Sequence, residues 1–302
     1  MMKTAVLFPG QGAQAPGMAR DFYEESVAAR QVFEEASDVL GYSMEQRIFE
    51  GQDLELTEFT QPAILTASRA IAVSLNLEGA AAAAGLSLGE YSALVFAGAL
   101  NFAEALQVVS ARGKFMQEAV PAGVGGMTAV LKLDRKSIEG ILEQLGLDVW
   151  IANVNCPGQI VVSGRLDALA AFKERAMEAG AKGCVDLPLS APFHTKMLEP
   201  AAVRLQGVLE DVSVREPHPP VVFNVTARTE ADPAIIRQLL TSQVMSPVLF
   251  EDSLRTLADL GIERMIEVGP GSTLKSFVKK TLKGVEIISV PDMESAKKAG
   301  LL

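Results

Sequence analysis

One serine stands in a pattern that is typical of a catalytic nucleophile. Ser87 lies between two glycines in the run Gly85-Leu86-Ser87-Leu88-Gly89. A nucleophile on a tight turn between a strand and a helix has a strained backbone, and flanking glycines leave room for that turn. The following helix would begin beneath the serine, so the backbone N–H of Leu88 could face a developing oxyanion. The alternative is an ordinary turn between a strand and a helix.

A serine hydroxyl needs a general base, and this chain has two histidines that could serve. His218 lies among prolines in Glu216-Pro217-His218-Pro219-Pro220, which predicts an exposed loop. His194 follows Ser190-Ala191-Pro192-Phe193. A lone histidine is usually a surface or packing residue. We assign that ordinary role to His218 and favour His194 as the base for Ser87.

Arg112 is a candidate for binding a substrate anion. It lies in Ser110-Ala111-Arg112-Gly113-Lys114, on a stretch that we expect to be helical. A guanidinium group can bind a carboxylate through two parallel hydrogen bonds. A solvated helix face is the commoner place for an arginine.

A glycine-rich loop, Gly10-Gln11-Gly12-Ala13-Gln14, follows a short apolar run near the start of the chain. Its glycines would let the backbone approach a ligand closely. The loop lacks the Lys-Ser/Thr pair of a phosphate-binding loop and the glycine spacing of a dinucleotide site. We therefore expect it to supply a second oxyanion donor rather than to cradle a phosphate.

The elements that would position these residues alternate between strand and helix patterns, which is typical of an α/β protein with a parallel sheet. The five alanines of Ala80–Ala84 would favour a helix by composition, but the run is short and wholly apolar and precedes the Ser87 turn, so we predict a strand. The other predicted strands are Thr4–Phe8, Val221–Asn224 and Met265–Val268. The predicted helices are Asp21–Leu40, Gln61–Leu77 with Pro62 in its first turn, Glu90–Ala97, Phe102–Ala119, Thr195–Leu209, Ala234–Leu240 and Phe250–Leu260.

The middle of the chain has a different order of elements. After the glycine-rich stretch Val120–Gly126, the patterns predict a strand, a helix, two strands, a helix and a strand, at Met127–Leu133, Arg135–Leu145, Trp150–Val154, Gln159–Ser163, Leu166–Ala179 and Lys182–Leu187. This βαββαβ order is that of a ferredoxin-like unit. We predict a small ferredoxin-like subdomain of residues 123–189, inserted into a larger α/β subdomain of residues 1–122 and 190–302.

Composition limits the classes of function. The chain has 302 residues, of which 49% are hydrophobic and 21% charged, as in a soluble globular protein. Its net charge of −10 argues against general binding of nucleic acid. The two cysteines, Cys156 and Cys184, form neither a metal-binding pair nor a disulfide framework. The apolar runs are too short for a signal peptide or a membrane span. We expect a cytoplasmic protein with no membrane or nucleic-acid partner.

The motifs, taken together and in order, resemble the malonyl-CoA:acyl carrier protein transacylase family over nearly the whole chain. The segments that carry the resemblance are Phe8–Gln14, Gly85–Leu94, Arg112-Gly113, Ala152–Val161, Ala191–His194, Gln243 before Ser246-Pro247-Val248, and Glu267–Gly271. The resemblance implies an α/β-hydrolase-like larger subdomain and an active site in the cleft between the two subdomains. It also implies transfer of a malonyl group from coenzyme A to acyl carrier protein in fatty acid biosynthesis, with no cofactor and no metal.

The resemblance further implies a role for each matching residue. Ser87 would be the acylated nucleophile and His194 the general base and then the general acid. Arg112 would bind the malonyl carboxylate, and the backbone N–H groups of Gln11 and Leu88 would form the oxyanion hole. Gln243 would lie beside His194 and Asn155 near the cleft. Phe193 would favour malonyl over branched acyl groups. The family commonly has His where this chain has Leu86, which removes a polar neighbour of the nucleophile but leaves the turn intact.

Three alternatives use the same features. A serine esterase or thioesterase would share the Ser87 turn but would normally need an acidic third residue and no carboxylate-binding arginine. A loading acyltransferase of a polyketide or polyunsaturated-lipid pathway would have the same chemistry with a different carrier. A non-catalytic protein that binds the carrier is disfavoured by the intact Ser87 and His194.

Overall fold

The larger part of the molecule is built around a parallel sheet. The structure is a computed structural model that describes residues 2–189 and 191–302. The sheet has five parallel strands in the order β7-β2-β1-β8-β9. They are β7 (Val221–Val222), β2 (Ala82–Gly85), β1 (Thr4–Phe8), β8 (Arg264–Val268) and β9 (Glu286–Val290). Strands β1 and β2 are almost wholly buried, which is why they read as continuous apolar runs in the sequence.

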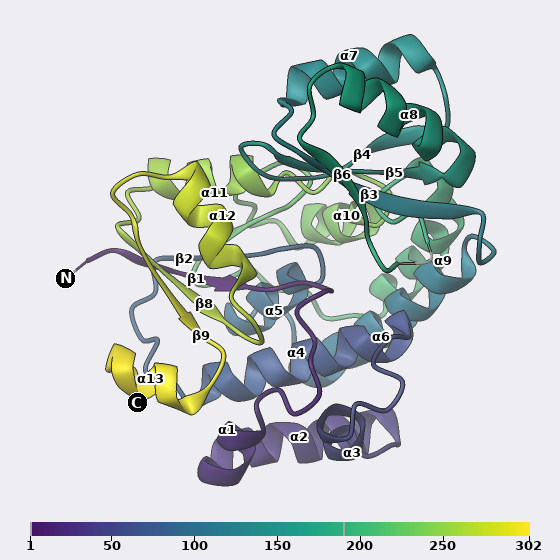
Figure 1. Cartoon of the computed structure of the whole chain (residues 1–302). Helices are drawn as coiled ribbons and strands as arrows, with labels where there is room; N and C mark the ends of the chain where they lie inside the picture. Colours follow the sequence, from purple (N-terminus) through teal and green to yellow (C-terminus); the bar gives the residue numbers. More distant parts are fainter. Residues whose placement is uncertain (1, 190) are drawn as a thin grey trace.

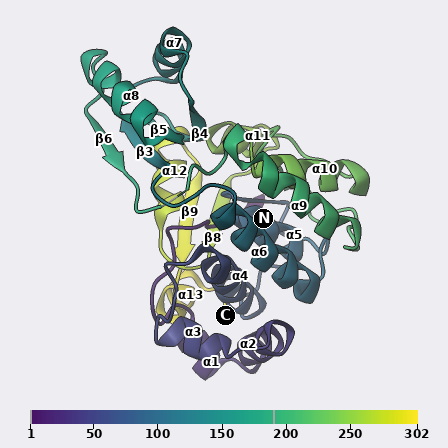
Figure 2. The same ribbon diagram turned by 90° about the vertical axis from the view of Figure 1, so that its right-hand side faces the viewer.

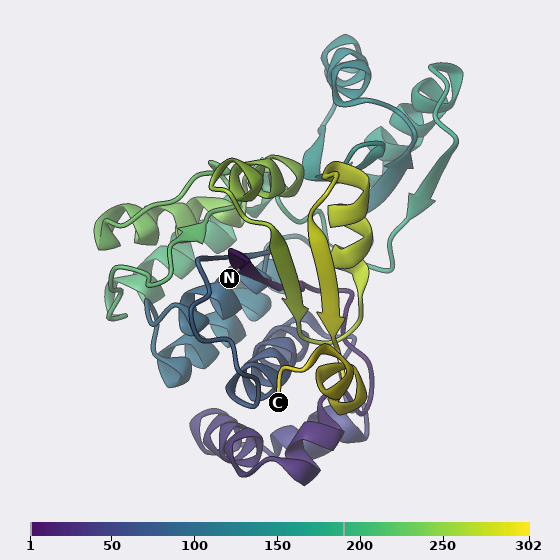
Figure 3. The same cartoon turned by 90° about the vertical axis from the view of Figure 1, so that its left-hand side faces the viewer.

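Helices cover both faces of this sheet (Figure 1). Val6 and Phe8 of β1 face a core that they share with α4 (Thr57–Val73), α5 (Gly89–Phe96), α6 (Phe102–Glu118), α9 (Glu199–Glu210) and α10 (Pro233–Gln243). Ala5 and Leu7 face the opposite side, where α11 (Phe250–Asp259) and α12 (Thr273–Thr281) pack. This alternation follows from the twofold side-chain period of a strand. The C-terminal segment, yellow in Figure 3, supplies the edge strand β9 and then α13 (Met293–Ala299).

A second, antiparallel sheet of four strands has the order β4-β5-β3-β6. Its strands are β3 (Gly125–Leu131), β4 (Val149–Cys156), β5 (Gln159–Arg165) and β6 (Gly183–Asp186), and its helices are α7 (Arg135–Leu145) and α8 (Leu166–Glu178). The strand order is the one that a ferredoxin-like βαββαβ unit produces, so the predicted fold class is confirmed. Helices α7 and α8 lie at the opposite end of the molecule from α1 (Arg20–Glu25), α2 (Val27–Leu40) and α3 (Met44–Phe49) (Figure 2).

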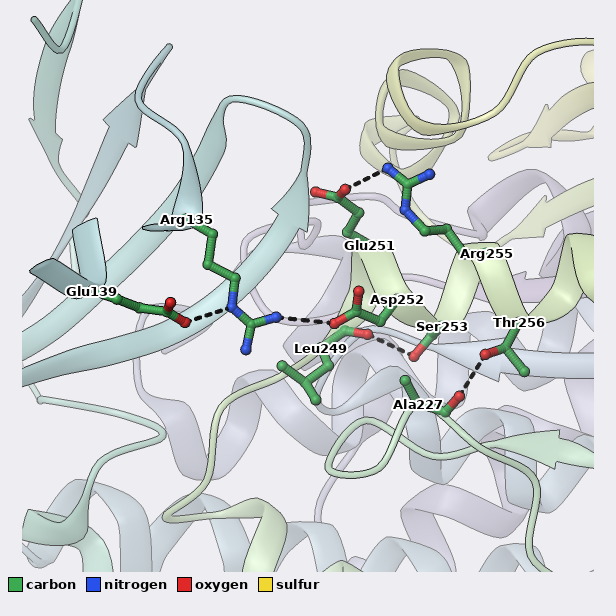
Figure 4. A network of polar contacts seen from close by, with 9 residues as sticks. All are labelled: Arg135, Glu139, Ala227, Leu249, Glu251, Asp252, Ser253, Arg255 and Thr256. Carbon is green, nitrogen blue, oxygen red and sulfur yellow. Dashed lines mark hydrogen bonds and ion pairs between the residues drawn. The ribbon is translucent and has the colours of Figure 1, made fainter. Parts of the chain in front are cut away.

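The small sheet is attached to the rest of the chain by backbone and side-chain contacts. Val248 donates its N–H to Ala152 of β4 at 2.8 Å and accepts the N–H of Val154 at 2.9 Å. Beside this bridge, the Arg135 guanidinium at the start of α7 lies 2.9 Å from Glu139 and 3.2 Å from Asp252 of α11 (Figure 4). The ion pair with Asp252 therefore links α7, which packs on the small sheet, with α11, which packs on the large sheet.

Several predicted elements need correction. The helix expected at Asp21–Leu40 is two helices, because Ser26 caps the second by accepting the N–H of Ala29. Pro62 lies inside α4 rather than in its first turn, because the helix already begins at Thr57, whose N–H donates to Gln117 of α6 at 2.9 Å. Helix α9 begins at Glu199 after a short 3-10 turn, Lys196–Leu198. The predicted Val221–Asn224 strand ends at Val222.

Four elements lie in stretches where the sequence predicted none: α3, α12, β9 and α13. The expected subdomain boundary at residue 190 lies outside the described residues. Within the described part of the chain, no helix combines the length and the apolar composition that crossing a membrane requires.

Candidate active site

Ser87 occupies a sharp turn between β2 and α5. Its φ of 52° lies in the left-handed region, which non-glycine residues rarely adopt. The turn is possible only with glycines on both sides. A Cβ on Gly85 would lie 1.9 Å from the carbonyl carbon of Gly89, and a Cβ on Gly89 would lie 2.2 Å from the carbonyl oxygen of Phe8. The backbone of α5 therefore packs directly on β1, and the Ser87 side chain points into a cavity above the sheet.

His194 lies opposite Ser87, although 107 residues separate them in the chain. Its Nε2 is 2.8 Å from Ser87 Oγ, and its Nδ1 is 2.8 Å from the backbone carbonyl of Gln243. A carbonyl can only accept, so Nδ1 carries the proton and Nε2 is free to accept the Ser87 hydroxyl proton. Burial, and then the charge of Arg112, lower the pKa of His194 to about 4. The imidazole is therefore neutral at physiological pH.

The Arg112 guanidinium projects from α6 into the same cavity. Its Nη1 donates to Gln61 Oε1 at 2.7 Å, and its Nη2 donates to Gln243 Oε1 at 2.8 Å and to Ser87 Oγ at 3.3 Å. The side chain is only 1% exposed, and burial lowers its pKa. An arginine nevertheless stays protonated in proteins, so the cavity holds a fixed positive charge beside the Ser87 hydroxyl.

Gln11 and Leu88 also border the cavity. Within residues 2–189 and 191–302, neither backbone N–H has a hydrogen-bond acceptor. The N–H of Ser87 itself is occupied, because it donates to Asn224 Oδ1 at 2.7 Å. Free donors beside a serine–histidine pair are what an oxyanion hole requires.

Comparison with known proteins shows to which family the chain belongs. The family model described as acyl transferase domain matches residues 6–302. The malonyl CoA-acyl carrier protein transacylase of Bacillus subtilis is 42% identical over 306 aligned residues, which cover 99% of this chain and 96% of that protein. The chain belongs to the malonyl CoA-acyl carrier protein transacylase family.

Solved structures of this transacylase family have the same fold. The malonyl CoA-acyl carrier protein transacylase of Clostridium perfringens superposes with a TM-score of 0.95 at 42% identity, covering 98% of this chain and 96% of that one. A malonyl-transacylase solved in complex with a type II PKS acyl-carrier protein also has a TM-score of 0.95, at 37% identity with 98% of each chain covered. The similarity therefore extends over the whole described fold.

The remaining residues that the sequence singled out lie around the same cavity, whose volume is about 210 Å³. Phe193 and Leu86 form part of its apolar wall. Asn155 is 6% exposed, and its Oδ1 has no partner among the described residues, so it can accept a hydrogen bond from a ligand. His218 lies apart, with 77% of its side chain exposed, as expected.

Sequence reasoning missed three polar residues of this transacylase-family site: Gln61, Glu90 and Asn224. Gln61 holds one end of Arg112. Asn224 accepts the N–H of Ser87 at 2.7 Å, and Glu90 accepts the N–H of Asn224 at 2.5 Å. Glu90 directly follows the Gly85–Gly89 motif, which was a usable signal for it. Asn224 lies 137 residues from Ser87, and nothing in its local sequence marks it.

Proposed function

We propose that this chain transfers a malonyl group from coenzyme A to the phosphopantetheine thiol of acyl carrier protein in fatty acid biosynthesis, through a malonyl-Ser87 intermediate. The observation that carries the proposal is the cluster of Ser87 Oγ, His194 Nε2 at 2.8 Å and Arg112 Nη2 at 3.3 Å in one cavity. Membership of the transacylase family and the fold shared with a transacylase that binds an acyl-carrier protein support it.

In the first half-reaction, Ser87 attacks the thioester carbonyl of malonyl-CoA. As the Oγ–C bond forms, His194 Nε2 takes the hydroxyl proton. The N–H groups of Gln11 and Leu88 would stabilise the tetrahedral oxyanion, and losing one such donor typically costs about 3 kcal/mol. The C–S bond then breaks, and His194 returns its proton to the sulfur of CoA.

In the second half-reaction, the carrier thiol replaces CoA in the cleft. His194 takes the thiol proton as the sulfur attacks the malonyl-serine carbonyl. The Oγ–C bond breaks, Ser87 regains a proton from His194, and the thioester of the carrier leaves. Because one thioester replaces another, the reaction gains little energy, and the acyl-enzyme must be kept from water.

Arg112 would bind the free malonyl carboxylate. Its amide partners Gln61 and Gln243 hold the guanidinium in place before substrate arrives. Acetyl lacks the carboxylate and would leave this buried cation without an anionic partner, which favours malonyl. The unpartnered Oδ1 of Asn155 would accept an N–H of the pantetheine arm, and Phe193 would border the acyl group.

We further propose residues 123–189 as a subdomain that closes one side of the cleft, and the cytoplasm as the site of action. Met127, Ala129 and Asn155 of the small sheet border the cavity, which supports the first. Cys156 and Cys184 are both free thiols, as suits a reducing compartment.

Intact-mass analysis after exposure to malonyl-CoA tests the central proposal. The wild-type protein should gain one malonyl group and lose it when holo-acyl carrier protein is added, whereas Ser87→Ala should gain none. Stoichiometric CoA release followed by retention of the acyl-enzyme supports a transferase. Continuous CoA release without carrier would instead identify a thioesterase, and no covalent adduct on wild type would overturn the mechanism.

A further inference from the structure

A buried carboxylate lies beneath the site and takes no part in the reaction as proposed. Glu90, in the first turn of α5, is fully buried and does not border the cavity. Its Oε2 accepts the backbone N–H of Asn224 at 2.5 Å, and its Oε1 accepts the Nε2 of Gln243 at 3.1 Å. Both oxygens therefore act as acceptors.

Gln243 connects this carboxylate with Arg112. An amide side chain has one donor end and one acceptor end. The Nε2 end of Gln243 faces Glu90 and also donates to the Ser87 carbonyl at 3.0 Å. The Oε1 end accepts from Arg112 at 2.8 Å. An ionised carboxylate can only accept and a guanidinium can only donate, so these two neighbours dictate which way the amide points.

Asn224 connects the same carboxylate with the nucleophile. Its Oδ1 accepts the Ser87 N–H at 2.7 Å, and its Nδ2 donates to the Gly85 carbonyl at 2.7 Å. A residue at φ 52° cannot place its N–H in a sheet or a helix, so this side chain supplies the missing partner. Glu90 fixes Asn224 by accepting its backbone N–H.

We propose that Glu90 is a positioning residue for acyl selection: it orients the Gln243 amide, and through that amide it aims the Arg112 guanidinium at the malonyl carboxylate. The inference rests on the proposed function and adds a residue to it. Glu90 acts through Gln243 and Arg112 and touches no substrate, so it is not a catalytic residue.

Glu90→Gln tests the relay without changing side-chain size. The new amide can still accept from Asn224 with its oxygen, but its NH₂ then meets the Nε2 of Gln243, donor against donor. Turning Gln243 over would place its NH₂ against the Arg112 guanidinium. Leaving such a buried group unpaired costs about 10- to 100-fold in binding. We expect the ratio of malonyl to acetyl kcat/KM, measured with holo-carrier protein at about pH 9, above the raised pKa of Glu90, to fall by about tenfold or more.

A merely structural defect would lower both rates together, so the ratio separates the two roles. Asn224→Ala removes support from Ser87 and a long 3.5 Å contact with Gln243 Nε2, but it keeps the shorter bonds of Gln243 to Glu90 and Arg112. It should therefore lower malonyl and acetyl transfer by nearly the same factor. Asn101→Ala is the matched control: Asn101 caps α6 by accepting the N–H groups of Ala103 and Glu104. It should leave the ratio unchanged.

A second measurement needs no variant. Burial raises the pKa of Glu90 to about 8, against the opposing effects of the Asn224 N–H, the Arg112 charge and the Gln243 amide. Arg112 on α6 and Tyr91 on α5 are the charged and titratable groups that act on it in the described structure. Burial raises the pKa of Tyr91, and a guanidinium stays protonated in proteins, so neither side chain changes its charge near neutrality. A protonated Glu90 resembles the glutamine of the Glu90→Gln variant, so the malonyl-to-acetyl ratio of the wild type should be highest above the pKa of Glu90 and fall as the pH drops through it, from about pH 9 to about pH 7. Protonation of His194 slows both substrates and cancels in the ratio.

The outcomes distinguish this inference from the proposed function. Absence of malonyl-Ser87 in the wild type would end the proposed function. A wild type that transfers malonyl, together with a folded Glu90→Gln whose ratio is unchanged, would overturn the relay alone. If Glu90→Gln does not fold, a wild-type ratio that stays constant between about pH 7 and pH 9, across the raised pKa of Glu90, overturns the relay instead.

Discussion

At the scale of single residues, the proposed reaction requires an unprotonated His194 held in one tautomer beside Ser87. A backbone carbonyl, rather than a carboxylate, receives the Nδ1 proton. Among residues 2–189 and 191–302, no carboxylate pairs with the ring, and burial, followed by the charge of Arg112, lowers the pKa of His194 to about 4. As the proposed base, His194 would be unprotonated over the whole neutral range, but it would hold the Ser87 proton only weakly once it had taken it.

This gives a pH prediction for the acylation step. Below its pKa a histidine is charged and cannot accept a proton, so activity is lost as pH falls through the pKa of His194 and is retained above it. At saturating malonyl-CoA, where binding of the carboxylate no longer limits the rate, we expect malonyl-Ser87 formation to stay nearly constant from about pH 6 to 8 and to slow below about pH 5. Quench-flow of wild-type protein with malonyl-CoA measures it. A fall in this rate centred near the ordinary pKa of histidine, about 6.5, would contradict a buried and neutral imidazole.

Arg112→Ala should change acyl selection more than catalysis. Hydrogen bonds to charged groups contribute about 1.5–3 kcal/mol each, so malonyl transfer should fall about 100-fold or more, whereas acetyl transfer should be spared or raised. Arg204→Ala is a control, because Arg204 pairs with Glu118 at the surface. Competition between malonyl-CoA and acetyl-CoA gives the ratio directly, and an unchanged preference in Arg112→Ala would refute the assignment.

The sequence predicts the residues of this site unevenly, for physical reasons. Ser87 is predictable because its turn requires glycine on both sides, and His194 because the chain has only two histidines. The place of Glu90 in the site could be predicted from the glycine motif that it follows, but its hydrogen-bond partners could not, and neither the place nor the partners of Asn224 could, since both residues act through tertiary hydrogen bonds. The Asn224 contact with Ser87 spans 137 residues. Polar residues that support a site carry no local pattern of their own.

At the scale of elements, the crossing of α5 over β1 should tolerate no side chain at Gly89. Gly89→Ala would place a Cβ 2.2 Å from the Phe8 carbonyl oxygen, which is backbone and cannot swing away. We expect a loss of at least about 3 kcal/mol in the free energy of unfolding, measured by denaturant titration.

Gly140 provides the matched control, because it lies inside α7 and a Cβ added there would meet no atom within 4 Å. Gly140→Ala should stabilise the protein by about 0.5–1 kcal/mol, since alanine loses less backbone freedom than glycine in a helix. If both substitutions had the same small effect, the α5–β1 contact would not be as close as described.

The elements that the sequence left unpredicted lack local signals. Helix α12 begins without a side-chain cap of its own. Its first N–H groups, those of Leu274 and Lys275, donate instead to Glu267 of β8 at 2.8 Å and 3.0 Å. Strand β9 lies at the sheet edge with only Val290 fully buried, so its apolar pattern is weak. In contrast, α7 was predicted with correct bounds because Asp134 caps it and Gly146 ends it.

At the scale of the whole molecule, the two sheets share one core. Met127, Ala129, Ala152 and Val161 of the small sheet belong to the same buried cluster as Val6 and Phe8 of the large one. The opposite face of the small sheet packs on α7 and α8 in a core of its own. Unfolding of the small sheet would therefore expose apolar residues that pack on the large sheet as well. The two sheets should for this reason unfold together.

The only tryptophan allows this coupling to be measured. Trp150 lies on β4, so its fluorescence reports the small sheet, whereas far-UV circular dichroism reports all helices and strands. We expect the two signals to change with the same midpoint during denaturant unfolding, because the shared core leaves neither layer stable alone. Asp252→Ala should leave the midpoints coincident and shift them little, since the exposed Arg135–Asp252 pair contributes at most about 1 kcal/mol. A fluorescence transition at a clearly lower denaturant concentration than the dichroism transition would mean that residues 123–189 unfold independently. The small sheet would then leave the cavity while the turn at Ser87 is still folded.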